Sequence, residues 1–283
     1  MELTAAEIRR AVRAALAEDL GGGDVTTLAT VPPAAQSVAF MRAREPLVVA
    51  GVRFVEIAFK QLSPKIKIER PARDGRRVKT GETILKISGS SRAILSAERV
   101  ALNFIQRLSG VATATAQFAD AIRGTSAKIL DTRKTTPGWR RFEKYAVACG
   151  GGKNHRIGLF DMVLIKDNHL VALRNEKPNA IAAAILRARK KFPKLKIEAE
   201  ADTLEQVAQA ADAGADIILL DNMTLAQLRQ AVKIIRGRAK TEASGGVNLK
   251  TVRAIAATGV DFISVGAITH SARAVDIGLD FEN

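Results

Sequence analysis

The second half of the chain repeats one pattern, in which a short apolar run is followed by a segment with helical periodicity. A short apolar run suits a buried strand, and strands that alternate with helices form parallel βαβ units. Repetition of this unit predicts a closed or nearly closed α/β barrel rather than an open sheet. The expected strands are residues 128–131, 162–165, 197–199, 217–220, 241–243 and 262–265, and the expected helices include 180–191, 203–213, 224–236 and 249–257.

The first 123 residues follow a different pattern, which predicts a small β-rich domain with flanking helices. Residues 4–18 place apolar side chains at helical spacing, and the run Gly-Gly-Gly-Asp at 21–24 ends that helix. Residues 92–123 predict two helices separated near Ser109 and Gly110. Tight turns between residues 74 and 89 resemble those of biotinyl and lipoyl carrier domains, but no lysine flanked by methionine marks a modified hairpin tip. Short strands are expected at 37–42, 47–50, 65–69 and 83–88.

The chain is strongly basic, with 44 Lys and Arg residues against 29 Asp and Glu residues and a formal net charge of +15. Such a charge is compatible with nucleic acid, anionic lipid or a small polyanion as partner. Aromatic residues make up only 4% of the chain, so the base-stacking platforms of many nucleic-acid binders are scarce. The basic residues concentrate between Lys128 and Lys166, where several are embedded in Gly-rich or apolar sequence. This placement favours a small anionic ligand, with solubility alone as the alternative.

Composition predicts a globular cytoplasmic protein with no membrane association. Apolar residues make up 47% of the 283 residues, which is ample for a packed core. No apolar run approaches the roughly 18 residues that a membrane helix needs, and the N-terminus lacks the apolar region of a signal peptide. Cys149 is the single cysteine, so no internal disulfide can form.

Polar side chains follow the expected strands of the second half. Because the active site of an α/β barrel lies at the C-terminal ends of its strands, we expect these side chains to meet in one site. Arginine and lysine suit carboxylates and phosphates, and Gly-rich turns can direct backbone N–H groups at a phosphate. The acidic residues suit Mg²⁺ or a developing positive charge on a sugar, although each alone could instead form a salt bridge. The residues that follow the strands, of which Val265 has the one apolar side chain, are Thr132, Arg133, Lys134, Lys166, Asp167, Asn168, Glu200, Asp221, Asn222, Ser244, Gly245, Gly246, Ser264, Val265 and Gly266.

A glycine-rich segment near the middle of the chain lacks several familiar motifs. Asn154 follows the lysine of its Gly-Gly-Gly-Lys run where a Walker A loop needs Ser or Thr. His155 and His169 have no third ligand in register for zinc. Cys149 is expected to be a small buried thiol rather than a nucleophile. His155 and Arg156 are either a core histidine beside a surface arginine or a pair of hydrogen-bond donors to an anion.

Longer motifs run through nearly the whole chain and are densest between residues 131 and 169. They are residues 18–27 (EDLGGGDVTT), 98–103 (ERVALN), 108–110 (LSG), 131–138 (DTRKTTPG), 145–156 (YAVACGGGKNHR), 164–169 (LIKDNH), 198–200 (EAE), 220–222 (LDN), 242–246 (EASGG) and 264–266 (SVG). Together they resemble the quinolinate phosphoribosyltransferase family.

The resemblance implies an enzyme that transfers phosphoribosyl from phosphoribosyl pyrophosphate to quinolinate with decarboxylation. The products would be nicotinate mononucleotide, CO₂ and pyrophosphate, in NAD biosynthesis. It implies an N-terminal α/β sandwich domain over residues 1–110, joined by the C-terminal tail, and an incomplete seven-stranded α/β barrel over residues 111–283. It also implies a homodimer in which Arg99 reaches the partner's site, with no role for nucleic acid.

The resemblance further assigns roles to residues of the expected site. The carboxylates of quinolinate would be held by Arg133, His155, Arg156 and Lys166. Phosphoribosyl pyrophosphate and its Mg²⁺ would face the catalytic residues Lys134, Glu200 and Asp221, and the two carboxylates would reach the metal through phosphoribosyl pyrophosphate or through water. Thr132 would also bind substrate. The 5-phosphate would be bound by the turns at Ser244, Gly245 and Gly246 and at Ser264, Val265 and Gly266, with help from His270.

Two other hypotheses remain to be separated from this one. A paralogue of the same fold, associated with molybdenum transport, is disfavoured because the His155-Arg156 and Lys166–His169 motifs are intact. A basic nucleic-acid-binding module would need exposed aromatic residues or a recognition helix, and the sequence indicates neither.

Overall fold

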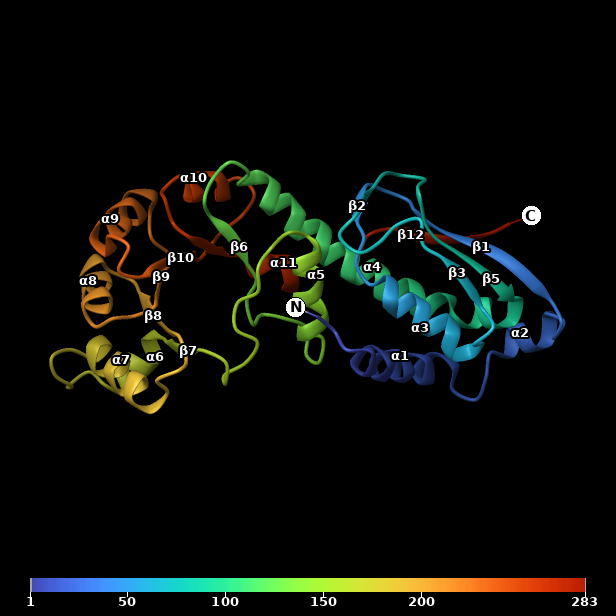
Figure 1. Ribbon diagram of the computed structural model, residues 1–283, viewed down its shortest axis with the longest axis horizontal. Helices are drawn as coiled ribbons and strands as arrows, with labels where there is room; N and C mark the ends of the chain where they lie inside the picture. The colour runs from blue at the N-terminus through green and yellow to red at the C-terminus, as the bar shows by residue number, and fades with distance from the viewer. Residues whose placement is uncertain (1, 283) are drawn as a thin grey trace. The chain divides into compact units, whose positions relative to one another are not determined.

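The computed structural model describes residues 2–282, which form two compact units (Figure 1). The first unit contains the described residues up to Ala116, together with Pro137–Gly151 and the residues from Ser271 onward. The second unit contains Gln117–Thr136 and Gly152–His270. One has a small antiparallel sheet and the other a parallel sheet with helices, which confirms the predicted α/β fold class.

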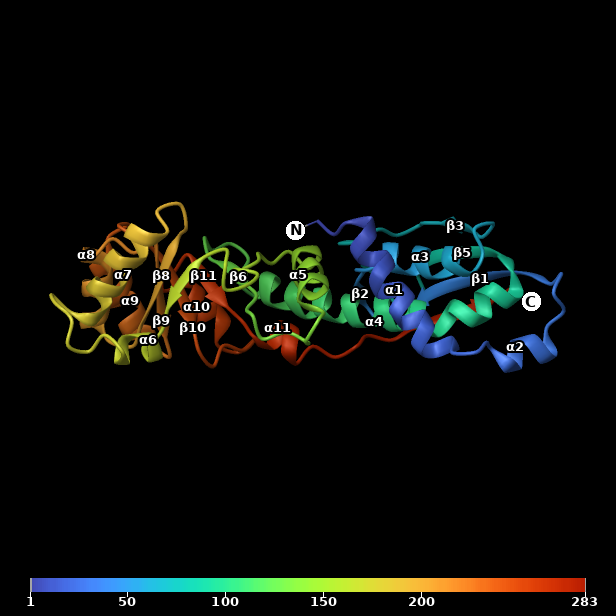
Figure 2. The same ribbon diagram turned by 90° about the horizontal axis from the view of Figure 1, so that it is seen from below.

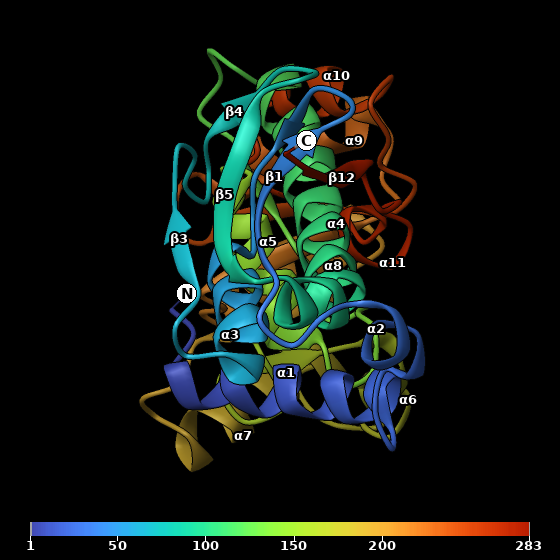
Figure 3. The ribbon, with the colours of Figure 1, turned by 90° about the vertical axis from the view of Figure 1, so that its right-hand side faces the viewer.

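The first unit is built on an antiparallel sheet of four strands, which the end of the chain completes (Figure 3). Its order is β12 (Ile277–Phe281), β1 (Gln36–Ala43), β5 (Thr83–Ser90) and β3 (Lys67–Glu69). Ala39, Met41 and Ala43 alternate along β1 and are fully buried, as expected for a strand with one face in the core. The remaining elements are α1 (Ala5–Leu20), α2 (Val25–Thr30), β2 (Leu47–Val48), α3 (Val52–Leu62), β4 (Arg77–Val78), α5 (Arg140–Cys149) and, up to Ala116, α4 (Ser91–Ala121).

A single helix, α4, replaces the two helices expected between residues 92 and 123. Ser109 is fully buried, and its hydroxyl accepts a hydrogen bond from Ala50 N at 2.9 Å and donates one to Ala50 O at 3.2 Å. Gly110 lies against the backbone of Arg273, whose carbonyl oxygen is 1.9 Å from the position that a Cβ would occupy. The prediction of a break was therefore wrong, because the Ser-Gly pair permits close packing and does not end the helix.

We expect Gly110→Ala to lower the free energy of unfolding by about 3 kcal/mol. The clashing atom belongs to the backbone, so no rotamer change relieves the contact. Gly22→Ala is the matched control in the same unit, because nothing lies within 4 Å of its Cβ position and it should change stability by less than about 0.5 kcal/mol. Urea unfolding of both variants checks this, and equal stabilities would contradict the packing role of Gly110.

The second unit contains a parallel sheet with helices along it. The strand order is β6 (Lys128–Leu130), β11 (Phe262–Ser264), β10 (Lys240–Ser244), β9 (Ile217–Asp221), β8 (Ile197–Ala201) and β7 (Val163–Ile165). The helices are α6 (Asp167–Val171), α7 (Ala180–Lys191), α8 (Leu204–Asp212), α9 (Leu225–Ile235), α10 (Val252–Ala256) and α11 (Ala267–His270). α7 and α8 pack along β8, and α8 also contacts β9 (Figures 1 and 2). Because all six strands are parallel, their C-terminal ends meet at one edge.

This sheet has six strands over the described residues, where seven were expected. Beside β6, Lys153 makes a single parallel bridge to Leu130, in which Lys153 N donates to Ile129 O at 2.8 Å. The residues around Lys153 are glycines and polar residues without an apolar run, so a full strand does not form there. Between residues 2 and 282, no helix combines the length and the apolar character needed to span a membrane.

Candidate active site

The C-terminal ends of the strands in the second unit surround a cavity of about 300 Å³. Every residue that lines it belongs to this unit, so the cavity forms within one compact body. Most of the residues predicted at the strand ends are brought together here. The predicted residues in the lining are Thr132, Arg133, Lys134, His155, Arg156, Lys166, Glu200, Asp221, Ser244 and Ser264, and the others are Leu164, Leu219 and Glu242.

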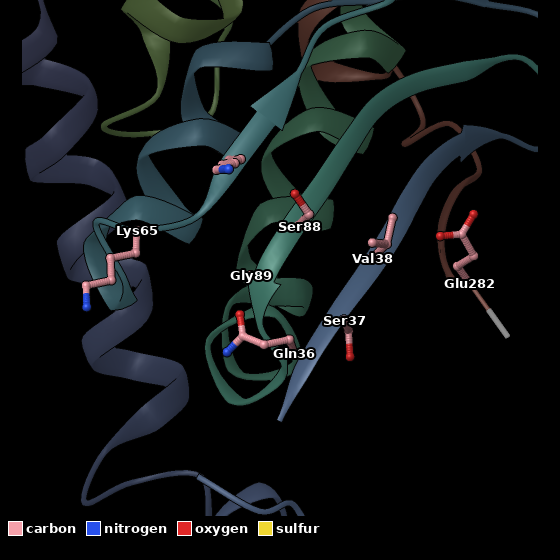
Figure 4. Close-up of a pocket in the computed structure, with 8 residues that line it drawn as sticks. Gln36, Ser37, Val38, Lys65, Ser88, Gly89 and Glu282 are labelled. Carbon is pink, nitrogen blue, oxygen red and sulfur yellow. The ribbon is translucent and has the colours of Figure 1, made fainter. Parts of the chain in front are cut away.

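A larger hollow of about 550 Å³ lies over the sheet of the first unit (Figure 4). Its lining includes the uncharged residues Gln36 and Ser88, and Lys65 and Glu282 stand at opposite sides of it in Figure 4. The charged groups of this hollow do not converge on one point, in contrast to those at the strand ends. We therefore place the candidate active site in the second unit.

Strand register arranges the acidic residues of the cavity in two layers. In the β8–β9 pairing Glu200 lies opposite Leu219, and in the β9–β10 pairing Asp221 lies opposite Ser244. Side chains two residues apart on a strand share a face, so Glu198 lies one layer below Glu200. The upper layer faces the cavity and the lower layer is buried.

The upper layer contains three carboxylates whose arrangement fits a divalent cation. One oxygen from each of Glu200, Asp202 and Asp221 lies within 4.8 Å of the others. Clustered carboxylate oxygens are the ligands that Mg²⁺ prefers. Burial raises the pKa of Glu200. The positive charge of Lys166, whose Nζ lies 3.6 Å from Glu200 Oε2, opposes this shift. Burial also raises the pKa of Asp202, and repulsion from Asp221 adds to this effect.

Asp202 is a member of this cluster that the sequence analysis missed. Its signal is present in the run Glu198-Ala-Glu-Ala-Asp202, where acidic residues occupy alternate positions. Alternation along a strand places such residues on one face. The acidic pattern therefore continues past Glu200 to Asp202, the residue directly after β8.

Two arginines give the cavity a concentrated positive charge. Arg156 is only 9% exposed, and its Nη1 donates to the carbonyl of Met162 at 3.3 Å. Burial lowers the pKa of Arg156, and the nearby Arg133 guanidinium lowers it further by repulsion. A ligand with two negative charges offsets such repulsion between neighbouring cations. The pair of arginines therefore suits a dicarboxylate.

His155 connects the cavity with the buried layer below it. Its Nε2 lies 2.9 Å from Glu198 Oε2 and 3.6 Å from Glu242 Oε2, and its Nδ1 accepts a hydrogen bond from the backbone N–H of Arg156 at 2.7 Å. The proton is therefore on Nε2, and both ring nitrogens have partners within the protein. His155 therefore lies between the backbone of Arg156 and the two buried acids, and it also lines the cavity.

Glu198 and Glu242 form a buried acidic pair at the base of the cavity, where Glu242 is part of the lining, and the sequence analysis assigned no role to either residue. Their side chains are 0% and 1% exposed. Burial raises the pKa of Glu242, repulsion by Glu198 raises it further, and His155 opposes the shift. A proton retained by the pair reduces the cost of burying two carboxylates side by side.

We expect Glu242→Gln to flatten the pH dependence of stability. The pKa of Glu242 is raised from 4.5 to about 8, so its stabilising contribution is complete below the unfolded-state value and is lost as the pH rises toward 8. Glutamine stays neutral, so between pH 5 and pH 8.5 the stability of the variant should rise by about 4 kcal/mol relative to that of the wild type. Urea unfolding at both pH values measures this, with Glu205→Gln on the exposed face of α8 as the control. Parallel pH profiles for Glu242→Gln and wild type would contradict the prediction.

The turn after β11 brings two further predicted residues together. A Cβ on Gly266 would lie 3.1 Å from His270 Nε2 and 3.2 Å from Lys134 Cδ. The hydroxyl of Thr269 donates to the carbonyl of Lys134 at 2.8 Å, which ties α11 to the segment after β6. Lys134 and His270 therefore stand beside a turn where the backbone is accessible because glycine has no side chain.

The remaining predicted residues lie in three different settings. Gly245 and Gly246, after β10, have left-handed backbones with φ of +94° and +59°. Val265 is buried, and its backbone N–H donates to Leu130 O at 2.9 Å. This N–H is therefore already used within the sheet, whereas the sequence analysis expected it to face a phosphate. Arg99 is exposed on α4 in the first unit and is not part of the cavity lining.

The sequence matches two family models that together cover most of its length. The C-terminal domain of quinolinate phosphoribosyl transferase matches residues 111–280, and the N-terminal domain of the same family matches residues 24–109. The chain belongs to this family. The family predicted from the sequence motifs is therefore confirmed.

Relatives of this family are similar to the chain over nearly its full length. Nicotinate-nucleotide pyrophosphorylase [carboxylating] of Mycobacterium leprae is 43% identical over 278 residues, which cover 96% of both chains. The chloroplastic enzyme of that name from Arabidopsis thaliana is 43% identical over 292 residues, covering 98% of this chain and 83% of its own length. The solved structure of NadC from Streptococcus pyogenes superposes with a TM-score of 0.94 at 39% identity and covers 100% of both chains. The nicotinate-nucleotide pyrophosphorylase from Francisella tularensis gives a TM-score of 0.93 at 41% identity, covering 99% of this chain and 98% of that one.

Proposed function

We propose that this family member transfers the phosphoribosyl group of phosphoribosyl pyrophosphate to quinolinate, with decarboxylation to nicotinate mononucleotide. CO₂ and pyrophosphate are the other products. The observation that carries the proposal is the division of one cavity into two parts, an arginine pair suited to a dicarboxylate and a carboxylate cluster suited to a cation. The names of the full-length relatives support the same reaction.

The quinolinate end of the site is the positively charged part of the cavity. Arg133 and Arg156 hold the two carboxylates of quinolinate through their planar guanidinium groups. Lys166 adds a third positive charge while remaining paired with Glu200 at 3.6 Å. His155 acts indirectly, since its Nδ1 accepts from Arg156 N and fixes the segment that carries this arginine.

The phosphoribosyl pyrophosphate end is the carboxylate cluster together with the two glycine turns. Glu200 and Asp221, directly or through water, would hold Mg²⁺ carried by the pyrophosphate, and bound Mg²⁺ supplies charge neutralisation to the leaving group. The fit of this cluster to a cation rests on one carboxylate oxygen from each of Glu200, Asp202 and Asp221, which lie within 4.8 Å of one another. The 5-phosphate is bound at the turns after β10 and β11, where Lys134 and His270 flank Gly266.

The reaction proceeds in two steps that need no covalent enzyme intermediate. First, the bond between ribose C1 and pyrophosphate breaks, pyrophosphate keeps the electron pair, and the pyridine nitrogen bonds to the oxocarbenium-like C1. Second, the bond from ring C2 to its carboxylate breaks, CO₂ leaves, and the electron pair stays on C2 beside the positively charged nitrogen. A proton from water then gives nicotinate mononucleotide. The residues of the chain position both substrates and balance their charges.

Arg99 extends the proposal to a second copy of the chain. It is exposed on α4 in the first unit, and we assign it to the active site of the partner in a homodimer. Mixing Arg99→Ala chains with Asp221→Ala chains tests this. The assignment predicts that mixtures regain activity which neither variant has alone, because one mixed site then has both residues.

Incubation with phosphoribosyl pyrophosphate, Mg²⁺ and either quinolinate or nicotinate tests the proposed reaction. The expected result is nicotinate mononucleotide and equimolar CO₂ from quinolinate, with little product from nicotinate because it lacks one of the two carboxylates. Absence of product from quinolinate by a folded protein would contradict the proposal and favour the paralogue with another substrate.

A further inference from the structure

Asn222, directly after β9, has a backbone conformation that non-glycine residues rarely adopt. Its φ is +52°, in the left-handed region, and the only other described non-glycine residue with a positive φ is Arg236. Arg236 is the C-cap of α9, a position where left-handed conformations are common. Asn222 caps no helix and lies beside the proposed site, where a strained backbone often has a functional reason.

The contacts of Asn222 reach two parts of the site. Its side-chain Nδ2 donates to Asp221 Oδ2 at 2.6 Å, and its backbone N–H donates to Ser244 O at 2.9 Å. The position that a Cβ on Gly245 would take is 2.0 Å from Asn222 Oδ1. Asn222 therefore touches a carboxylate of the cation cluster and, on the neighbouring strand, the start of a glycine turn.

We propose that Asn222 is a positioning residue that couples the orientation of the Asp221 carboxylate to the conformation of the Ser244–Gly246 turn. This inference rests on the proposed function, because it assigns these two parts to the cation and the phosphate of one substrate. Both parts are set by the same side chain: its amide group fixes one oxygen of Asp221, and its carbonyl oxygen fills the space beside Gly245.

The arrangement has consequences for both neighbours of Asn222. With Oδ2 of Asp221 held by the amide, the carboxylate keeps a single orientation, so its other oxygen remains directed for use by the cation. Gly245 needs to be glycine for two reasons. Its φ is +94°, and a Cβ there would clash with the side chain of Asn222. A simple turn-forming role for Asn222 would require only the left-handed backbone, which glycine supplies equally well.

Asn222→Gly separates these two roles, because glycine keeps the left-handed conformation and loses the side chain. Calorimetric titration with phosphoribosyl pyrophosphate in Mg²⁺ should show affinity about tenfold lower than for the wild type, the loss expected for a hydrogen bond to a charged group. Quinolinate binding, measured alone, should stay within about twofold. Arg236→Gly is the matched control, since it also places glycine at a left-handed position, and it should bind both substrates like the wild type.

Gly245→Ala, made in both backgrounds, tests the coupling itself. The new alanine strains the backbone in both the wild-type and the Asn222→Gly background. Its Cβ clashes with the Asn222 side chain only in the wild-type background. We therefore expect Gly245→Ala to reduce affinity for phosphoribosyl pyrophosphate more in the wild type than in Asn222→Gly.

The inference is overturned if Asn222→Gly binds phosphoribosyl pyrophosphate and Mg²⁺ as tightly as the wild type, or loses quinolinate binding to the same degree. It is also overturned if the two Gly245→Ala effects are equal. Failure of the proposed function has a separate signature, because the wild type itself would then form no nicotinate mononucleotide. If the wild type forms product and Asn222→Gly binds phosphoribosyl pyrophosphate as the wild type does, only the positioning role is refuted.

Discussion

Arg156→Ala should lower kcat/KM for quinolinate by about 10²- to 10³-fold. Arg156 is 9% exposed and its guanidinium is near that of Arg133, so its removal leaves one ligand carboxylate without a partner at a buried position. Arg156→Lys should recover only part of the loss, because an ammonium group keeps the charge but not the planar fork. Steady-state kinetics with quinolinate varied at saturating phosphoribosyl pyrophosphate measure both effects.

Controls distinguish this loss from damage to the fold. Arg187→Ala removes an arginine of the same unit that is exposed and pairs with Glu176, and its kcat/KM should stay within about twofold of the wild type. Thermal unfolding of Arg156→Lys establishes that the variant is folded. If both variants are folded and both keep the wild-type KM for quinolinate, the assignment of the arginine pair to this substrate is contradicted.

Glu200→Gln and Asp221→Asn should each reduce kcat by about 10²- to 10³-fold at ordinary Mg²⁺ concentrations. Each change removes a negative charge from a cluster whose oxygens lie within 4.8 Å of one another. Removal of divalent cations with a chelator should abolish activity in the wild type, and added Mg²⁺ should restore it. Titration of kcat against Mg²⁺ concentration measures the effect.

Two further variants define how local this effect is. Asp202→Asn should show a smaller loss, about tenfold, because Asp202 is exposed at the end of β8. Asp212→Asn removes a carboxylate that is 70% exposed and pairs with Arg238, so activity should be unchanged. Wild-type Mg²⁺ dependence in both Glu200→Gln and Asp221→Asn would rule out the carboxylate cluster as the cation site.

The fold of the second unit could be predicted because its signals are local. Apolar runs and helical periodicity mark the strands and helices, and the helix at Ala180–Lys191 has the bounds that its periodicity predicts. Strand-end side chains could also be predicted to meet, since parallel strands end at one edge. The cavity accordingly contains Arg133, Lys166 and Glu200, which are far apart in sequence.

What the sequence did not predict depends on contacts between distant segments. Ser109 and Gly110 resemble a helix end, but their small size permits close approach of Ala50 and Arg273. The pairing of Glu198 with Glu242 arises from strand register, which places two acids in one buried layer. Likewise, His155 Nε2 lies near Glu198 and Glu242 on two other strands, and no local motif specifies these contacts.

The central claim, that the chain transfers phosphoribosyl to quinolinate and removes one specific carboxyl group, is tested most directly with carboxyl-labelled substrate. Quinolinate carrying ¹³C in the 2-carboxyl group is incubated with the enzyme, phosphoribosyl pyrophosphate and Mg²⁺. The label in CO₂ and in nucleotide is then measured by NMR. We predict that all of the label in converted substrate appears as CO₂ and none in nicotinate mononucleotide. Label retained in the nucleotide, or no nucleotide formed, would contradict the account.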